Sequence, residues 1–414
     1  MRFESDALVV IEDGVIRAFG AYDTTRSALD PATPVTRYGD DSLIAPGFID
    51  LHVHYPQTQM IGAPGLQLLE WLESYAFAAE RQFGDVAHAR AVAELFLGEC
   101  LRAGTTTAMV FCSVHPASVD AFFEASEALG TRMIAGKVMM DRNAPAALLD
   151  TAQRGYDESK ALIAKWHGRG RHGYAITPRF APTSSPAQLE AAGGLWKESP
   201  GTWLQSHVAE THAECEWVKD LFPDRRDYLD VYDHHGLLGP GAVYGHGIWL
   251  SEAERRRCHE SGTAIAHCPT SNLFLGSGLF AIDAAKRSER PLRVGLGTDI
   301  GAGTRFSQLA TMKAACEVAQ LRRTPLAAPF VWYLATRGAA QALQLEDTIG
   351  SLAPGCEADL VVLDLRSTPL IDFRMGFCRN LEEILLLQIV LGDERATRAT
   401  YIAGEPRYQR DPAQ

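Results

Sequence analysis

Eight short apolar runs, alternating with amphipathic stretches, limit the possible folds of this chain more than any other feature of its sequence. Runs that are apolar almost throughout are typical of parallel strands buried on both faces, and amphipathic stretches between them indicate helices. Eight strand–helix units are the number that closes a (β/α)8 barrel. The runs are Gly47–His54, Thr106–Phe111, Arg132–Met139, Gly173–Thr177, Thr202–Val208, Ala242–His246, Thr263–His267 and Leu292–Thr298. The clearest amphipathic stretches are Val86–Arg102, Pro116–Gly130, Ala146–His167 and Ser185–Glu198.

Polar residues at one end of the runs favour this barrel over an open, doubly wound sheet, which is the alternative with the same alternation of elements. They stand at the C-terminal ends of the strands, and in barrel enzymes that end carries the catalytic residues. The sequence therefore predicts an α/β fold, a (β/α)8 TIM barrel, with a functional site at that rim. The polar residues are His52, His54, Arg179, His207, Glu210, His246, His267 and Asp299.

The two ends of the chain do not continue the barrel pattern and predict a second, smaller unit. Near the N-terminus, Ala7–Glu12 and Val15–Phe19 have strand patterns joined by an Asp-Gly pair, a strong hairpin turn. Near the C-terminus, Ala358–Leu363 and Ala399–Ala403 are further apolar strands. We therefore expect a small β-sandwich domain built from both termini. The expected boundaries are residues 1–45 plus 349–414 for this domain and 46–348 for the catalytic barrel.

Composition and charge exclude several classes of protein. The 414 residues carry a formal net charge of −12, which argues against a nucleic-acid partner because phosphate contacts need clustered Lys and Arg. The eight cysteines lack CxxC spacing, so we expect reduced thiols, as in cytosolic proteins. The first residues form no signal-peptide segment, and no apolar run approaches the roughly 20 residues of a membrane span. We therefore expect a cytoplasmic protein without a membrane partner.

Two histidines at the end of the first run are the most informative functional residues. His52 and His54 are two positions apart, so on a strand their side chains point to the same face. A single histidine is more commonly structural, but two imidazoles at the mouth of a barrel are typical of metal ligands. Catalytic zinc sites use several nitrogen and oxygen ligands and keep one position open for water. His207 is the best candidate for a third ligand, and Asp299 for a fourth.

Two further polar residues at strand ends suit proton transfer. Glu210, three residues beyond His207, fits general acid–base catalysis when the surrounding pocket raises its pKa. His246 ends its own strand, where it either binds the metal or hydrogen-bonds to the attacking water, and we favour the second role. Asp299 supplies an oxygen ligand and a place for a proton. The other histidines are expected to be structural or solvated, with His267, at a strand end, as the candidate for the pocket rim.

At this point the sequence resembles the amidohydrolase superfamily over nearly its whole length. The matching features are Pro46–His54, the strand that ends at His207, Asp299 after the last strand, and Pro354–Leu360. These features alone do not separate the deaminases of the superfamily from one another. Three further sets of residues together resemble the guanine deaminases: Tyr55–Gln59 with Leu69–Leu72, Thr177–Thr183, and His267–Leu273.

The resemblance implies a single zinc ion and names its ligands. Two-metal members of the superfamily use a carboxylated lysine at the end of the fourth strand, where this sequence has Thr177-Pro178-Arg179, so one metal per chain is expected. The sequence departs from many relatives at Ala209, where Ser is expected, and at Arg305, where a small polar residue is usual and a surface position is expected. The implied zinc ligands are His52, His54, His207 and Asp299.

The resemblance also implies which residues contact a purine. An Arg fork donates to acceptors on the edge of the base, a Gln amide offers both a donor and an acceptor, and an aromatic ring packs on the plane of the base. The implied contacts are Gln57, Arg179 and Phe180, with His207, Glu210 and Asp299 also facing the substrate.

The implied reaction is the hydrolytic deamination of guanine to xanthine and ammonia, a step of purine catabolism. Zinc activates water, Asp299 with the help of His246 accepts a proton, and Glu210 protonates the ring nitrogen beside the amino-bearing carbon. The nearest alternative is an aminohydrolase that acts on another purine, a pterin or a triazine. A cyclic-amide hydrolase is disfavoured by the absent lysine, and a non-catalytic scaffold by the complete ligand set. The resemblance also favours a homodimer.

Overall fold

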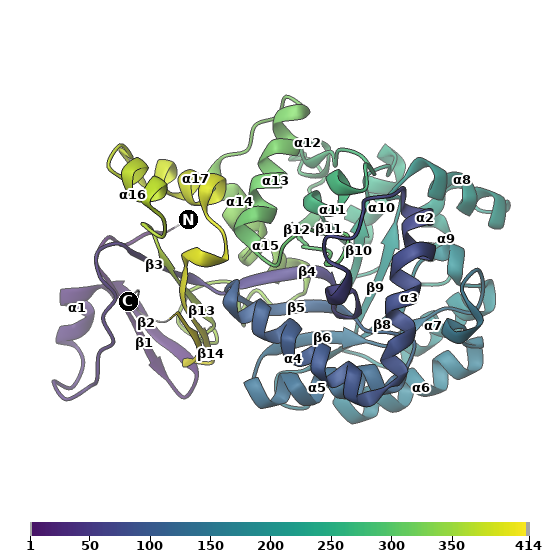
Figure 1. The fold of residues 1–414 in the computed structure, drawn as a ribbon, viewed down its shortest axis with the longest axis horizontal. Coiled ribbons are helices and arrows are strands. Elements are labelled where there is room, and N and C mark those ends of the chain that lie inside the picture. Colours follow the sequence, from purple (N-terminus) through teal and green to yellow (C-terminus); the bar gives the residue numbers. More distant parts are fainter. Residues whose placement is uncertain (1, 411–414) are drawn as a thin grey trace.

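The computed structural model of the protein describes residues 2–410. A barrel of parallel strands surrounded by helices lies beside a smaller region of antiparallel strands (Figure 1). All eight runs predicted as barrel strands are strands, and the third is divided in two at Lys137. The barrel strands are β4 (Phe48–His54), β5 (Thr105–Phe111), β6 (Arg132–Gly136), β7 (Val138–Met139), β8 (Gly173–Pro178), β9 (Trp203–Val208), β10 (Ala242–His246), β11 (Ala264–His267) and β12 (Arg293–Leu296).

The barrel closes through the segment that follows its last strand. The strands are hydrogen-bonded in the order β12-β11-β10-β9-β8-β6-β5-β4, with β7 paired to β8, and the pairs are parallel. Past β12, the N–H of Asp299 donates to the carbonyl of His52 at 2.9 Å, and the N–H of His54 donates to the carbonyl of Ile300 at 3.1 Å. The chain therefore forms the predicted barrel and not an open doubly wound sheet.

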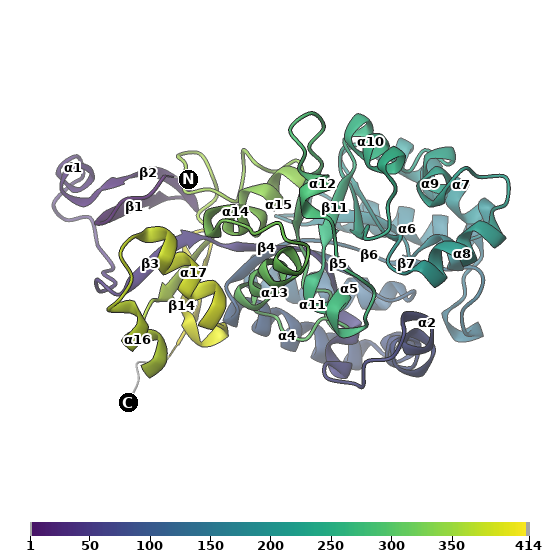
Figure 2. The same ribbon diagram turned by 90° about the horizontal axis from the view of Figure 1, so that it is seen from above.

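Helices cover the outside of the barrel, as Figure 2 shows from above. The helix predicted over Ala146–His167 is shorter than expected, because Ala146–Leu148 forms a separate 3-10 turn and the side chain of Thr151 caps α6 by accepting a hydrogen bond from the N–H of Arg154. The main helices are α4 (Val86–Arg102), α5 (Pro116–Leu129), α6 (Ala152–Trp166), α7 (Pro186–Glu198), α8 (His212–Leu221), α9 (Tyr228–His234), α10 (Glu252–Ser261), α13 (Gln308–Leu321), α14 (Ala328–Leu334) and α15 (Arg337–Ala342). Within residues 2–410, no helix combines the length and the apolar content needed to cross a membrane.

A series of short helical segments connects β4 to α4 at the C-terminal end of the barrel. This connection contains one of the three sets of residues that together resemble the guanine deaminases, and it brings apolar side chains to the mouth of the barrel. Its segments are η1 (Tyr55–Met60), α2 (Leu68–Trp71), the π-helical η2 (Leu72–Ala76), α3 (Phe77–Glu80) and η3 (Arg81–Gly84). Two further short helices, α11 (Pro269–Phe274) and α12 (Ile282–Ala285), follow β11.

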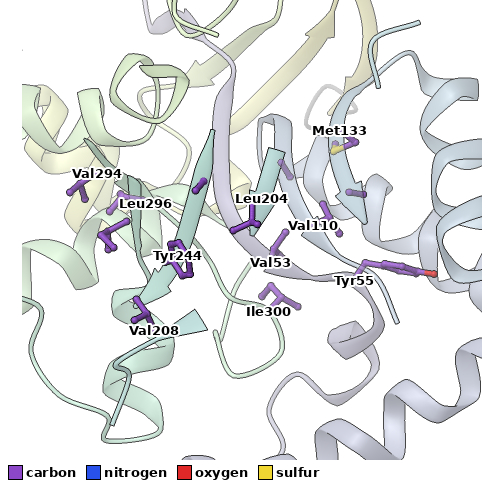
Figure 3. Close-up of a cluster of buried hydrophobic side chains, with 14 of the residues drawn as sticks. Val53, Tyr55, Val110, Met133, Leu204, Val208, Tyr244, Val294, Leu296 and Ile300 are labelled. Atoms are coloured by element: carbon purple, nitrogen blue, oxygen red, sulfur yellow. The ribbon is translucent and has the colours of Figure 1, made fainter. Parts of the chain in front are cut away.

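Apolar side chains from strands on opposite sides of the barrel belong to one core. Val53 of β4, Val110 of β5, Leu204 of β9 and Tyr244 of β10 are fully buried members of this cluster (Figure 3). Burying an aliphatic side chain of this size stabilises the fold by roughly 1.5–3 kcal/mol. The strands are therefore held rigidly, and the polar residues at their C-terminal ends have fixed positions.

The antiparallel strands come from both ends of the chain, as predicted. A hairpin of β1 (Ala7–Glu12) and β2 (Val15–Ala21) turns at Asp13 and Gly14, which have φ values of 52° and 76°. The second sheet has the order β15-β14-β13-β3 and shares a small apolar core with the hairpin. The domain boundaries at residues 45/46 and 348/349 stay a prediction. The strands of this sheet are β3 (Ser42–Pro46), β13 (Leu360–Asp364), β14 (Thr397–Ile402) and β15 (Glu405–Gln409).

A group of ion pairs connects the antiparallel sheet to the barrel. Arg132 of β6 and Arg171, which precedes β8, both donate to the carboxylate of Glu357, and Arg171 also donates to Asp359. These two acidic residues belong to Pro354–Leu360, the second motif shared with the superfamily. In this chain the motif therefore joins the end of the barrel away from the mouth to the smaller sheet. The remaining helical segments are α1 (Tyr22–Ser27), η4 (Ala146–Leu148), η5 (Ala181–Thr183), α16 (Pro369–Met375), α17 (Leu381–Leu391) and η6 (Glu394–Ala396).

A glycine in β10 leaves room for the predicted ligand His52. A Cβ at Gly245 would lie 2.5 Å from Cε1 of the His52 ring. We expect Gly245→Ala to displace this ring, because overpacking a buried position costs about 1–3 kcal/mol, which corresponds to metal binding weaker by a factor on the order of 10 to 100. Metal content after dialysis against a competing chelator measures the effect.

The matched control is Gly194→Ala. Gly194 lies on the exposed side of α7, and a Cβ there would meet no atom within 4 Å. This substitution should leave metal content unchanged and raise helix stability slightly, since alanine favours helices over glycine. Equal metal retention in both variants would show that His52 does not need the space beside Gly245.

Candidate active site

A cavity at the C-terminal end of the barrel brings together nearly all the residues predicted to act there. His52 lies beside this cavity, fully buried, and does not line it. The polar lining comes from five strand ends and from η1, and half of the apolar lining residues come from the connection between β4 and α4. The lining residues are His54, Gln57, Leu68, Trp71, Leu72, Arg179, Phe180, His207, Glu210, His246, Leu275, Asp299 and Ala302.

Four side chains direct possible metal-binding atoms to one point. Nε2 of His54 and Nε2 of His207 are 3.1 Å apart, and Oδ1 of Asp299 is 3.4 Å from Nε2 of both His52 and His54. Two nitrogens bound to one tetrahedral zinc ion are about 3.3 Å apart. Nε2 of His52 is buried and has no hydrogen-bond partner among the residues of the structure, which a bound ion would provide. The donor set therefore fits a divalent metal ion.

Burial keeps these imidazoles neutral, as metal ligands must be. Burial and the neighbouring imidazole of His52 lower the pKa of His54 well below its ordinary value. Burial, with His52 and His54 next, does the same for the pKa of His207. Nδ1 of His207 donates to the carbonyl of Arg179 at 2.7 Å, which leaves the lone pair of Nε2 free for the metal. The ring is thus fixed in both orientation and tautomer.

A buried aspartate, Asp50, positions two of the predicted metal ligands. The carboxylate of Asp50 accepts hydrogen bonds from the N–H of Thr298 at 3.0 Å and from the N–H of His52 at 3.2 Å. The hydroxyl of Thr298 also donates to it. Asp299 follows directly in the chain, with a left-handed φ of 52° that turns it away from the strand direction. Asp50 therefore connects the strand that carries His52 to the turn that presents Asp299.

Glu210 and His246 form a second group next to the metal ligands. Oε2 of Glu210 is 3.4 Å from Nε2 of His246, and that nitrogen is 3.8 Å from Oδ2 of Asp299. Ser277 donates to the other oxygen of Glu210 at 2.8 Å, and Nδ1 of His246 lies 2.8 Å from Oδ1 of Asn272. These hydrogen bonds hold both side chains in one orientation, and both side chains line the cavity.

Burial prepares this pair for proton transfer. Burial raises the pKa of Glu210 to about 7, although His246 opposes the rise. Burial disfavours the charged form of His246, but Glu210 and Asp299 outweigh it and raise the pKa of this imidazole. A carboxyl group with a pKa near neutrality can both donate and accept a proton at neutral pH. His246 also lies close enough to His52 and Asp299 to bind a metal with them, so the choice between its two roles stays a prediction.

The predicted purine contacts line the same cavity, and two of them share a partner that the sequence did not suggest. Nη1 of Arg179 donates to both oxygens of Glu80, at 2.8 and 2.7 Å. Nε2 of Gln57 donates to the same carboxylate at 2.9 Å. Phe180 lines the cavity beside Arg179. Glu80 ends α3 in an otherwise apolar stretch, and a lone acidic residue there was the only signal for it.

The structure also shows where His267 and Arg305 lie, for which the sequence predicted the pocket rim and the surface. His267 is buried and stacks on Phe280 with ring centroids 4.7 Å apart, and it is not among the residues that line the cavity. Arg305 is exposed and lies 3.5 Å from Glu394, so the expected surface position is confirmed. Neither residue contributes to the site.

Comparison with known proteins shows the family of the chain. The Amidohydrolase family model matches residues 43–405 of the chain. Guanine deaminase from Escherichia coli is 48% identical over 411 residues, which cover 99% of this chain and 93% of that protein. Its solved structure has a TM-score of 0.96 and covers 99% of this chain and 94% of its own.

Two more distant solved structures share the fold. Guanine deaminase from C. acetobutylicum, with guanine bound in its active site, is 27% identical with a TM-score of 0.89, and the match covers 98% of this chain and 95% of that one. An adenosine deaminase from Xanthomonas campestris with bound zinc is 26% identical with a TM-score of 0.85, and the match covers 99% and 90%.

The metal site generates a direct prediction about His52. We expect His52→Gln to reduce bound metal to a small fraction of one equivalent, because it removes one of the converging imidazoles. Elemental analysis of purified protein measures this loss. His172→Gln is the control, since His172 is also buried but contacts Ser126 and Phe123 away from the cavity. A full equivalent of metal in His52→Gln would remove this residue from the ligand set.

Proposed function

The chain belongs to the amidohydrolase family, and we propose that it is a zinc-dependent guanine deaminase, which hydrolyses guanine to xanthine and ammonia. One observation carries the proposal: a single cavity is lined by Asp299 and by two of the three histidines of the predicted metal site, with His52 buried beside it. The same cavity is lined by Glu210 and by the predicted purine contacts Gln57 and Arg179. The 48% identity to guanine deaminase of E. coli over nearly the full chain supports it.

We infer that one zinc ion is held by His52, His54, His207 and Asp299. The solved adenosine deaminase from X. campestris has zinc bound, which supports this choice among divalent metals. When bound, zinc acts as a Lewis acid and lowers the pKa of water, so that the nucleophile is available at neutral pH. The carboxylate of Asp299 is suited to such a site: burial opposes its charge, but the neighbouring side chains of His52 and His246 hold its pKa at about 2.

The purine is bound and oriented by Gln57, Arg179 and Phe180. Arg179 donates to oxygen and nitrogen acceptors on the edge of the base, and Gln57 adds an amide that can donate and accept. The ring of Phe180 packs on the base, and Leu68 and Leu72 exclude water from its surroundings. Guanine thereby presents its amino-bearing carbon to the opposite wall, where the acid–base residues lie.

Proton transfers follow from the positions of the acid–base residues. Asp299 and the adjacent His246 accept a proton from the attacking water. Glu210 delivers a proton to the ring nitrogen beside the amino-bearing carbon, which makes that carbon electrophilic. After the new C–O bond forms, the proton taken from the water passes to the amino group, the C–N bond breaks, and ammonia leaves. The new hydroxyl group returns a proton to Glu210 and becomes the carbonyl. Guanine and one water become xanthine and ammonia, with all protons accounted for.

A second candidate is an aminohydrolase that acts on another purine, a pterin or a triazine. The shared fold of the adenosine deaminase from X. campestris favours keeping this candidate. Ammonia release from a panel of such bases distinguishes the two candidates, and a kcat/KM for another base that exceeds the value for guanine would favour the second.

The central test combines guanine turnover with one substitution. Zinc-loaded protein should convert guanine to xanthine, which the change of the ultraviolet absorption spectrum follows directly. Glu210→Gln should lower kcat by a factor on the order of 10² to 10⁴, because the proton donor is lost while the hydrogen-bonding shape is kept. Zinc content should remain at one equivalent, since Glu210 is not a ligand.

Glu254→Gln is the matched control for this test. Glu254 is another buried glutamate, in the first turn of α10, and it accepts hydrogen bonds from backbone N–H groups outside the cavity. Its substitution should leave kcat near the unchanged value. Retained turnover in Glu210→Gln would contradict the role of Glu210, and absent turnover in the zinc-loaded parent protein would contradict the proposed function itself.

We also propose a cytoplasmic homodimer. All eight cysteines are free, as expected in a reducing compartment. Large apolar side chains are exposed on α16, on α17 and in the segment between these two helices, which pack together at one end of the molecule (Figure 1). A second copy of the chain would cover them and remove this apolar surface from water. The exposed residues are Leu370, Phe373, Phe377, Leu386 and Val390.

The molar mass of the protein in solution tests the proposed dimer. Light scattering should give twice 45.2 kDa for the parent protein. The double variant Phe373→Ser and Phe377→Ser should have a lower mass, or a dimer dissociation constant higher by a factor of about 10 or more. Leu321→Ser is the control, because Leu321 is equally exposed on α13. A monomeric parent protein would contradict the dimer, and an unaffected double variant would place the interface elsewhere.

A further inference from the structure

Glu80 is a buried acidic residue that the mechanism above does not use. Its side chain is fully buried, it does not line the cavity, and its carboxylate accepts hydrogen bonds from Arg179 and Gln57. Both of these residues are also buried, at 2% exposure each. Glu80 therefore lies directly behind the two residues proposed to bind the edge of the purine.

The contact with Glu80 divides the donors of Arg179 into two groups. Nη1 is occupied by both carboxylate oxygens, at 2.8 and 2.7 Å, whereas Nε and Nη2 make no hydrogen bond to the protein within residues 2–410. Arg179 is also the only Lys or Arg among the residues that line the cavity. Glu80 thus determines which donors remain available and cancels the charge that they would otherwise bring to the cavity.

Glu80 also fixes the amide of Gln57. Nε2 of Gln57 donates to Glu80 at 2.9 Å, and Oε1 accepts from the N–H of Gly301 at 3.3 Å. Exchange of the amide oxygen and nitrogen would place two acceptors against each other at Glu80 and two donors against each other at Gly301. The orientation of the amide, and hence the pattern offered to a substrate, depends on this carboxylate.

We propose that Glu80 is a positioning residue that makes the binding wall electrically neutral, so that the site binds a neutral purine and releases a more acidic product. This inference rests on the proposed function. Deamination replaces a C–NH₂ group by a carbonyl beside a ring N–H, and xanthine loses its first proton more readily than guanine because the charge spreads over an additional carbonyl. An unpaired, buried Arg179 would attract the xanthine anion strongly, whereas a paired one does not.

Glu80→Gln tests the charge while keeping the size of the side chain. We expect the KM for guanine to rise by a factor of about 10 to 100, because the donors of Arg179 and Gln57 lose their alignment, with a smaller change in kcat and unchanged zinc content. The inhibition constant for xanthine should fall relative to the KM for guanine by a factor of about 10. This relative gain should be larger on the alkaline side of the first pKa of xanthine, where the anion predominates. A merely structural role predicts weaker binding of both ligands and no such dependence on pH.

A binding measurement that needs no turnover accompanies the kinetics. The affinities of xanthine and of hypoxanthine, which stays neutral at higher pH, are measured by calorimetry for the parent protein and for Glu80→Gln. Their ratio should shift toward xanthine only in the variant. If the parent protein fails to deaminate guanine, the proposed function is wrong, and this ratio still decides the role of Glu80. An unchanged ratio in a variant that folds and binds zinc would overturn the inference.

Two further variants separate charge from geometry. Glu80→Asp keeps the charge at a greater distance, so it should raise the KM for guanine without the gain of xanthine affinity at high pH. It also provides a test if Glu80→Gln is poorly folded, and a xanthine preference equal to that of Glu80→Gln would overturn the charge argument. Glu254→Gln removes a buried carboxylate outside the cavity and should leave both ligand affinities unchanged.

Discussion

The hydrogen bonds that close the barrel between β4 and the turn after β12 are the constraint on which the active site depends. They connect His52 and His54 on the first strand to Asp299, and the carboxylate of Asp50 reinforces the same junction through Thr298. Because both sides of the junction carry predicted metal ligands, closure of the barrel also brings together the residues of the proposed metal site. Apolar packing of the strands against the surrounding helices keeps the junction in register, so the polar groups at the C-terminal ends of the strands have fixed positions.

Burial gives the same side chains their chemical properties. It keeps His54 and His207 neutral, and it raises the pKa of Glu210 to about 7. Asp299, although equally buried, stays ionised because His52 is next to it. Two carboxyl groups in one cavity thus take different protonation states because of their neighbours, which suits the roles proposed for them, Asp299 as a metal ligand and Glu210 as a proton carrier. Among the predicted purine contacts, the carboxylate of Glu80 balances the charge of the buried Arg179.

Much of the fold and of the metal site was predictable because both depend on local, periodic patterns. Apolar runs of strand length revealed the barrel, and the spacing of His52 and His54 revealed a shared face at its mouth. The start of α6 was predicted wrongly because the capping side chain of Thr151 determines where the helix begins, whereas the prediction relied on the periodicity of apolar residues. Glu80 was missed because its partners are distant in sequence: Arg179 is 99 positions away, and only the folded barrel brings them into contact. A single acidic residue in an apolar stretch carries no periodic signal.

The contact between Asp50 and Thr298 also affects the conformational entropy of the chain. These residues are 248 positions apart, so their contact closes a loop that contains almost the whole barrel. Closing so long a loop is entropically unfavourable, and an ion shared by His52, His54 and Asp299 would act as a reversible cross-link at that point. The ion that takes part in catalysis would then also stabilise the barrel against unfolding. Removal of the ion by a chelator would destabilise the barrel first at the junction between β4 and the turn after β12.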